Sequence, residues 1–198
     1  MSSEHREAIL TAATDSFARF GFRKTSIEDV AKRAGVGKGT VYLHFESKEA
    51  LFAAAVRRVW GQAVAEVEAA VERARTPEAK VRAFLEVRES QIVRIARELR
   101  VSEEAVLELL PLVEPLVADF RDREVALLEA TLADGNAVGA FDVPDARLAA
   151  VGVAACVHGL ERFIVAPDWA RKLRDAQAAL FDVIVRGLVA RRSRRKGS

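Results

Sequence analysis

Apolar residues recur at spacings of three and four along most of the chain, which is the period of an amphipathic helix and not of a strand. The pattern predicts about nine helices and no sheet, so we expect an all-α fold. The five prolines stand mostly where a helix would begin or end. The predicted helices cover about residues 4–20, 27–34, 38–45, 48–74, 77–95, 102–110, 111–134, 145–165 and 168–191.

Capping residues mark several of these ends. Gly21 suits the C-terminal cap of the first helix, because glycine adopts positive φ at low cost. Thr25 or Ser26 is expected to cap the second helix, and Thr25 forms a capping-box pattern with Glu28. Ser47 stands in the same position before the fourth helix.

The helices are short up to about Ser47 and long after it, which indicates two parts joined without a flexible linker. We therefore expect an N-terminal domain of residues 1–47 and a helical domain of residues 48–192. Residues 193–198 are expected to be a disordered basic tail.

Composition narrows the class of protein. The single cysteine, Cys156, excludes an internal disulfide and a cysteine-based zinc cluster, and it fits a reducing cytoplasm. No apolar run is long enough for a membrane span, and the N-terminus is not expected to be a signal peptide. The net charge is only +2, and without its basic C-terminal residues the chain is slightly acidic, so nucleic-acid binding must rest on local placement of charge.

An enzyme is not expected. The three histidines, His5, His44 and His158, lie in different predicted helices, and the chain has no HExxH, GxSxG, GxGxxG or P-loop motif. We expect no catalytic residues, no metal site and no cofactor.

The stretch GVGKGTVYLHFESK, residues 35–48, concentrates glycines, cations and ring side chains in a chain that is otherwise aliphatic. Gly35 can take the positive φ that a tight turn between two short helices needs. Val41 and Phe45 would anchor one face of the second of these helices, while Gly37 and Gly39 would let a surface come close to the other face. This arrangement is typical of a helix-turn-helix that enters the major groove of DNA.

The same residues carry a resemblance to a known family. TSIEDVA at 25–31, AGV at 34–36, GTVYLHF at 39–45 and SKEAL at 47–51 resemble the DNA-binding signature of TetR-family repressors. The resemblance covers about residues 6–55, and the helical remainder is similar in length and layout to the family's ligand-binding and dimerising domain.

The resemblance implies roles at the DNA. Ser26 or Thr25 would cap the second helix and touch a phosphate, and Lys38, Gly39 and Thr40 would face base edges. The side chains implied to hold the DNA backbone are Tyr42, His44 and Lys48. Because Lys38 and Thr40 alone are good candidates for reading bases, much of the specificity would come from DNA shape.

A single helix-turn-helix makes too few contacts with DNA for tight, specific binding. We therefore expect a homodimer on a palindromic operator, with half-sites about 34–36 Å apart. Two glycines inside a helix indicate close approach of another helix, although packing within one chain is an alternative. The predicted interface residues are Gly152, Ala155, Cys156, Gly159, Phe181, Ile184 and Leu188.

The family places its effector among the later helices. The apolar candidates for a pocket wall are Phe84, Leu107, Leu110, Phe120 and Phe163, and the polar candidates are Arg88, Gln91, Glu124 and His158. The alternatives stay open here: the apolar residues suit an ordinary core, Arg88 and Glu124 suit solvated faces, and His158 suits an interface. A mostly apolar wall would favour a lipophilic small molecule.

The sequence thus predicts a DNA-binding transcriptional regulator, a repressor that a small lipophilic ligand releases from its operator. The alternative is a DNA-binding regulator with no small-molecule ligand, controlled by a protein partner or by its abundance.

Overall fold

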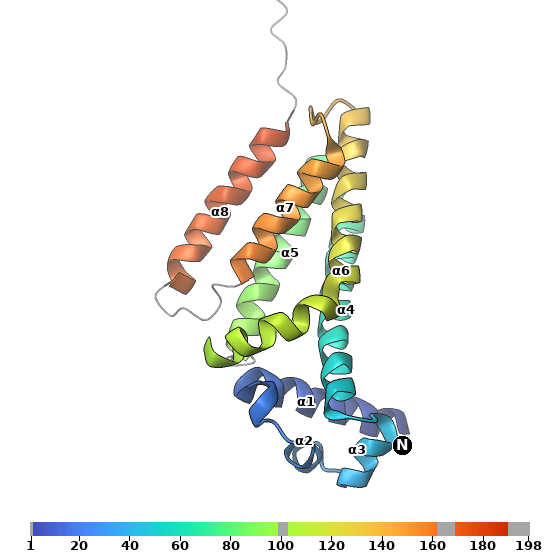
Figure 1. The fold of residues 1–198 in the computed structure, drawn as a ribbon. Helices are drawn as coiled ribbons and strands as arrows, with labels where there is room; N and C mark the ends of the chain where they lie inside the picture. The colour runs from blue at the N-terminus through green and yellow to red at the C-terminus, as the bar shows by residue number, and fades with distance from the viewer. Residues whose placement is uncertain (1, 99–102, 162–168, 190–198) are drawn as a thin grey trace, which may run out of the picture.

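The computed structural model describes residues 2–98, 103–161 and 169–189, which form eight helices and confirm the all-α fold. Figure 1 shows the helices that precede α4 gathered at one end, the long α4 rising from them, and most of the later helical segments toward the other end. The helices are α1 (Ser2–Lys24), α2 (Ile27–Ala34), α3 (Lys38–His44), α4 (Lys48–Arg73), α5 (Pro77–Glu98), α6 (Glu103–Ala137), α7 (Ala146–Glu161) and α8 (Trp169–Leu188).

The first core lies among α1, α2, α3 and the start of α4, and we call this part the head. Its buried side chains include Phe17 of α1, Val30 of α2 and Val41 of α3. Leu51 and Phe52 of α4 belong to the same core, so the first turns of the long helix are packed into the head. The division of the chain after residue 47 therefore stays a prediction.

The second core fills the other end, which we call the body. Val67 and Val71 from the far half of α4 pack there with Phe84, Leu128 and Val157 of α5, α6 and α7. α4 thus contributes to both cores and connects the head to the body as one continuous helix.

The prediction of two helices at 102–110 and 111–134 is wrong, because both segments belong to α6. Pro111 and Pro115 lie inside it, and each removes a backbone donor and crowds the preceding turn. The result is a bend and not an end: Figure 1 shows the first part of α6 crossing near α1, and the second part turning to run along α4.

The first part of α6 contacts the C-terminal end of α1. The helical path of α1 is interrupted at Gly21 (φ 78°, ψ 174°), and the Glu108 carboxylate accepts a hydrogen bond of 2.7 Å from the backbone N–H of Arg23. Lys24 adds an ion pair of 2.9 Å to Glu104. A Cβ at position 21 would lie 2.4 Å from the Glu108 carboxylate, which would have to move, and the positive φ itself favours glycine there.

A second glycine, Gly135, lies in the last turn of α6 where an aromatic ring packs closely. A Cβ on Gly135 would lie 2.1 Å from the ring of Phe141, which folds back over the end of α6 and is buried. Asp145 then caps α7, since its carboxylate accepts from Leu148 N at 2.8 Å.

Two predictions fall outside the described residues, namely the basic tail at 193–198 and the pocket residue Phe163. Among the described helices, none is long and apolar enough to cross a membrane.

Candidate nucleic-acid interface and effector site

The turn between α2 and α3 has the geometry of a helix-turn-helix. Gly35 adopts the left-handed conformation (φ 69°, ψ 28°), and Val36 N donates to Ala31 O at 3.0 Å, which closes the end of α2. Val41 is fully buried and Phe45 nearly so, which fixes α3 against the head core. The opposite face of α3 is left open to solvent.

Ser26, and not Thr25, caps α2. The Ser26 hydroxyl accepts from Asp29 N at 3.1 Å and donates to the Asp29 carboxylate at 2.6 Å. Thr25 is buried, and its hydroxyl donates to Gly21 O at 2.8 Å, with Ser16 O at 3.2 Å. The prediction that Thr25 touches a phosphate is therefore corrected, because its hydroxyl is used inside the head.

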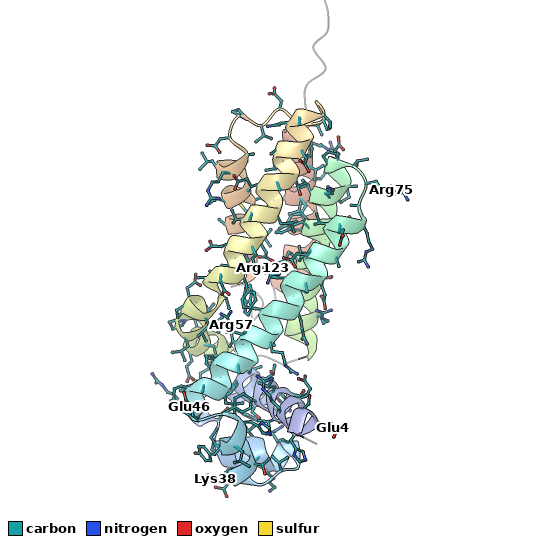
Figure 2. All side chains as sticks on the ribbon, turned by 90° about the vertical axis from the view of Figure 1, so that its right-hand side faces the viewer. Glu4, Lys38, Glu46, Arg57, Arg75 and Arg123 are labelled. Carbon is teal, nitrogen blue, oxygen red and sulfur yellow. The ribbon has the colours of Figure 1, made fainter. Side chains whose placement is uncertain are left out.

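The predicted base-facing residues lie together on the outside of α3. Lys38 and Gly39 are exposed and Thr40 is half-buried, while Tyr42 has 48% of its surface exposed. Figure 2 shows Lys38 at the tip of the head, far from the body. A Cβ on Gly39 would have no neighbour within 4 Å in the part of the chain that the structure describes, so packing does not require glycine there.

The two remaining predicted contacts are partly engaged within the protein. His44 is half-buried, with its ring 6.4 Å from that of Phe45. The Lys48 ammonium lies 4.4 Å from the centroid of the Phe22 ring and 3.5 Å from Arg23 O. Lys48 thus contacts the backbone of Arg23, the residue whose N–H donates to Glu108.

The four polar residues predicted for the effector site do come together in the body. Arg88 and Gln91 of α5, Glu124 of α6 and His158 of α7 meet near Trp60 of α4, and we call the four polar residues the polar cluster. Arg88 and Glu124 are 3% and 0% exposed, so neither lies on a solvated face.

Glu124 lies at the centre of the polar cluster. Its carboxylate oxygens lie 3.4 Å from Arg88 Nε and 3.0 Å from His158 Nε2. Arg88 Nη2, which can only donate, lies 3.3 Å from His158 Nδ1. A guanidinium, a carboxylate and an imidazole from three helices therefore meet in one buried place.

Gln91 connects the polar cluster to the surface. Its carbonyl accepts from Arg88 at 2.9 Å, and its amide donates to Ala63 O at 2.8 Å and to Glu66 at 3.0 Å. Burial alone raises the pKa of the Glu66 carboxyl, but hydrogen bonds from Gln91 and Arg94 outweigh that effect and hold the pKa below its ordinary value.

The apolar wall predicted for the pocket is only partly assembled. Phe84 lies in the body core, Phe120 is buried against α4, and Leu110 is half-buried. Leu107 is 67% exposed, so its predicted place in a wall is wrong. The first part of α6 packs against the head core through Leu109 and Val113. Leu107 therefore lies on the side of the helix that faces away from the head.

Trp60 connects the polar cluster to the head. The guanidiniums of Arg88 and Arg121 lie 5.4 and 5.6 Å from its ring centroid, and the His158 ring lies 6.0 Å away. The same indole lines an open apolar groove of about 120 Å³, together with Phe17 of α1 and other side chains of α1, α4 and α6.

Comparison with known proteins identifies the chain. Residues 9–55 match the model of the bacterial regulatory proteins of the tetR family. The regulator TtgR of Pseudomonas putida is 30% identical over 190 residues, which cover 89% of this chain and 88% of TtgR. The chain belongs to the TetR family.

Other relatives of this TetR-family chain share mainly the head. The regulator YhgD of Bacillus subtilis is 52% identical over 52 residues, which make up 26% of this chain and only 27% of that protein.

In overall fold the chain is similar to FadR of Bacillus subtilis, solved in complex with stearoyl-CoA. The TM-score is 0.73, and the identity is 22% over 92% of this chain and 98% of FadR.

Membership of the TetR family makes the chain a DNA-binding transcriptional regulator and not an enzyme, as the sequence predicted. His, Cys, Asp and Glu side chains form no group able to hold a metal ion within the described ranges.

The predicted interface of this TetR-family chain divides into an exposed part and a buried part. On α7, Gly152, Ala155, Cys156 and Gly159 form one exposed face. On α8, Phe181 and Leu188 are buried in the body core, so their predicted role in an interface is corrected, while Ile184 is only partly buried and its role stays a prediction. Val183 of α8 is 66% exposed.

One exposed residue of the head was missed by sequence reasoning. Leu43 is 84% exposed, on the side of α3 away from the buried Val41. The available signal was its position, because a residue two places after a buried one on a helix points to the opposite side.

Proposed function

We propose that this regulator is a repressor that a small lipophilic ligand releases from a palindromic operator. The observation that carries the proposal is the polar cluster, which is buried in the body beside Trp60, whose indole also lines the apolar groove at the head. A few convergent polar groups next to apolar surface suit a ligand with one polar group and an apolar body. FadR of Bacillus subtilis, similar in fold, was solved with stearoyl-CoA, a ligand that carries a long apolar acyl chain.

Release follows from the position of Trp60. A ligand that takes the hydrogen bonds of Arg88 or His158 must change the pairing around that indole, and the indole also contacts the groove against α1. If the ligand binds better to a form with shifted heads, it raises the population of that form. The two reading helices then no longer match half-sites about 34–36 Å apart.

The operator contacts would be divided between phosphates and bases. Ser26, Tyr42, His44 and Lys48 would hold phosphates and set the register of the head on the duplex. Lys38, Gly39 and Thr40 would face base edges in the major groove.

Two heads require a dimer, and α7 offers a face for it. Its exposed small residues would let the same helix of a second copy approach closely. An Ala155→Arg variant should sediment as a monomer and bind a palindromic operator far more weakly than wild type. A variant that remains dimeric would place the interface elsewhere.

The operator is tested by selecting genomic fragments with the wild-type protein and with a Tyr42→Ala, Lys48→Ala double variant. We expect wild type to enrich a short palindrome that the double variant loses. Absence of enrichment by wild type would contradict the proposed operator binding.

The ligand is tested by measuring release of that palindrome by fatty acids, their CoA thioesters and a broad set of other hydrophobic compounds. We expect at least one compound to weaken operator binding by wild type and to have a much smaller effect on His158→Gln. Equal binding of free operator by both proteins is the control that the head is intact.

One observation favours a second function. The polar groups of the cluster pair with one another, and the predicted apolar wall is only partly assembled, as expected of a filled core. A regulator without a small ligand, controlled by a protein partner or by abundance, would show operator binding that no compound in the screen changes.

A further inference from the structure

Leu43 has the largest exposed fraction, 84%, of the large apolar side chains that the structure describes as exposed. It lies on α3, the second helix of the helix-turn-helix, and not in a loop. Val41 and Phe45, on the opposite face of α3, are buried and hold the helix against the head core. The exposed Leu43 is therefore not needed for folding.

Leu43 also shares a face with the open glycine of α3. Gly39 precedes it by one helical turn, and residues four apart lie on the same side of a helix. Within the described part of the chain nothing stands within 4 Å of a Cβ at Gly39. The outer face of α3 is therefore bare backbone followed by a projecting isobutyl group, with Lys38 and Tyr42 exposed beside it.

A leucine side chain can neither donate nor accept a hydrogen bond, so it offers nothing to phosphates or to the polar edges of bases. The apolar group that the major groove presents is the C5-methyl of thymine. We propose that Leu43 reads one thymine in each half-site through this methyl group. The inference rests on the proposed operator contacts of α3, and it adds an apolar reader to Lys38 and Thr40.

The test removes the methyl group alone. Each thymine of the selected palindrome is replaced in turn by deoxyuridine, symmetrically in both half-sites, and Kd is measured for wild type and for Leu43→Ala. Losing one buried methyl weakens binding by about fourfold. We expect one pair of positions at which deoxyuridine costs wild type about fourfold per half-site and costs Leu43→Ala almost nothing.

The control is Val138→Ala, which truncates another exposed apolar residue, 71% exposed and far along the chain in the segment after α6. It should keep the full response to deoxyuridine. Because Leu43 is exposed, Leu43→Ala should unfold at the wild-type temperature, which excludes a folding defect.

Two results would overturn the inference alone: wild type that is indifferent to every deoxyuridine, or Leu43→Ala that remains as sensitive as wild type. A Leu43→Ala variant that binds more weakly but keeps the full wild-type response to deoxyuridine would likewise overturn it, and would point instead to contact with sugars or with a protein. Failure to enrich any palindrome would overturn the proposed operator binding, and this inference with it.

Discussion

Replacing Gly39 by alanine should stabilise the protein and at the same time weaken operator binding. Gly39 lies in the first turn of α3 and is not among the glycines with positive φ, so alanine can adopt its conformation. The added Cβ would meet nothing within 4 Å among the described residues. The protein alone therefore gives no reason for glycine at this position.

The gain in stability can be estimated. Glycine in a helix interior costs about 1 kcal/mol relative to alanine, and less in the first turn, so the free energy of unfolding should rise by about 0.5–1 kcal/mol. For a chain of this size that corresponds to an increase of about 1–4 °C in Tm. Thermal unfolding followed by circular dichroism at fixed protein concentration measures it.

The same substitution should weaken operator binding. If backbone at Gly39 approaches a base edge, a methyl group there pushes α3 away, and a tenfold loss in affinity corresponds to about 1.4 kcal/mol. We expect at least that loss, measured by fluorescence anisotropy with the selected palindrome. Gly61→Ala is the matched control, because its Cβ would make an ordinary 3.6 Å contact with Phe120 in the body.

Gly61→Ala should change stability in the same direction without changing operator affinity. The reasoning is refuted if Gly39→Ala is destabilised, since glycine would then serve the fold. It is equally refuted if Gly39→Ala binds the operator as well as wild type, since DNA would then not approach that face.

Three further predictions concern the rest of the molecule. Gly21→Ala should lower the free energy of unfolding by about 1–3 kcal/mol through backbone strain, and adding Glu108→Ala should recover the steric part, as urea unfolding can measure. Glu124→Gln removes the carboxylate from a buried ion pair and should cost about 3–5 kcal/mol in the same assay, while a cost below about 1 kcal/mol would contradict the pairing. The hydrogen bond and charge of Arg57 hold the pKa of the Asp119 carboxyl below its ordinary value. The stabilising effect of this pair is therefore present at neutral pH and lost as pH falls through the folded pKa, and an NMR titration should find a higher Asp119 pKa in Arg57→Ala.

The head could be predicted from sequence in considerable detail, because its signals are local. The positive φ of Gly35 and the cap at Ser47 depend on residues within a few positions. The choice between Thr25 and Ser26 could not be made locally, since it depended on which hydroxyl would be buried against α1.

The body needed the tertiary structure. Pro111 and Pro115 usually end helices, but Leu109 and Val113 pack on the head from both sides of Pro111, and this packing keeps α6 continuous and bent. The sequence likewise left open which face of α8 points into the body. Phe181 and Val183 are both apolar, and only the packing shows that Phe181 is the buried one.

The sequence by itself determined that this chain is helical and that it carries a helix-turn-helix, since both follow from periodicity and from residues close together in the chain. Only the tertiary structure decided that Arg88, Glu124 and His158, from three helices, form one buried cluster. From the sequence alone, Arg88 and Glu124 suit a solvated surface and His158 suits an interface. Burying a charge is tolerated only beside a partner, and the fold supplies the partner from a distant part of the chain.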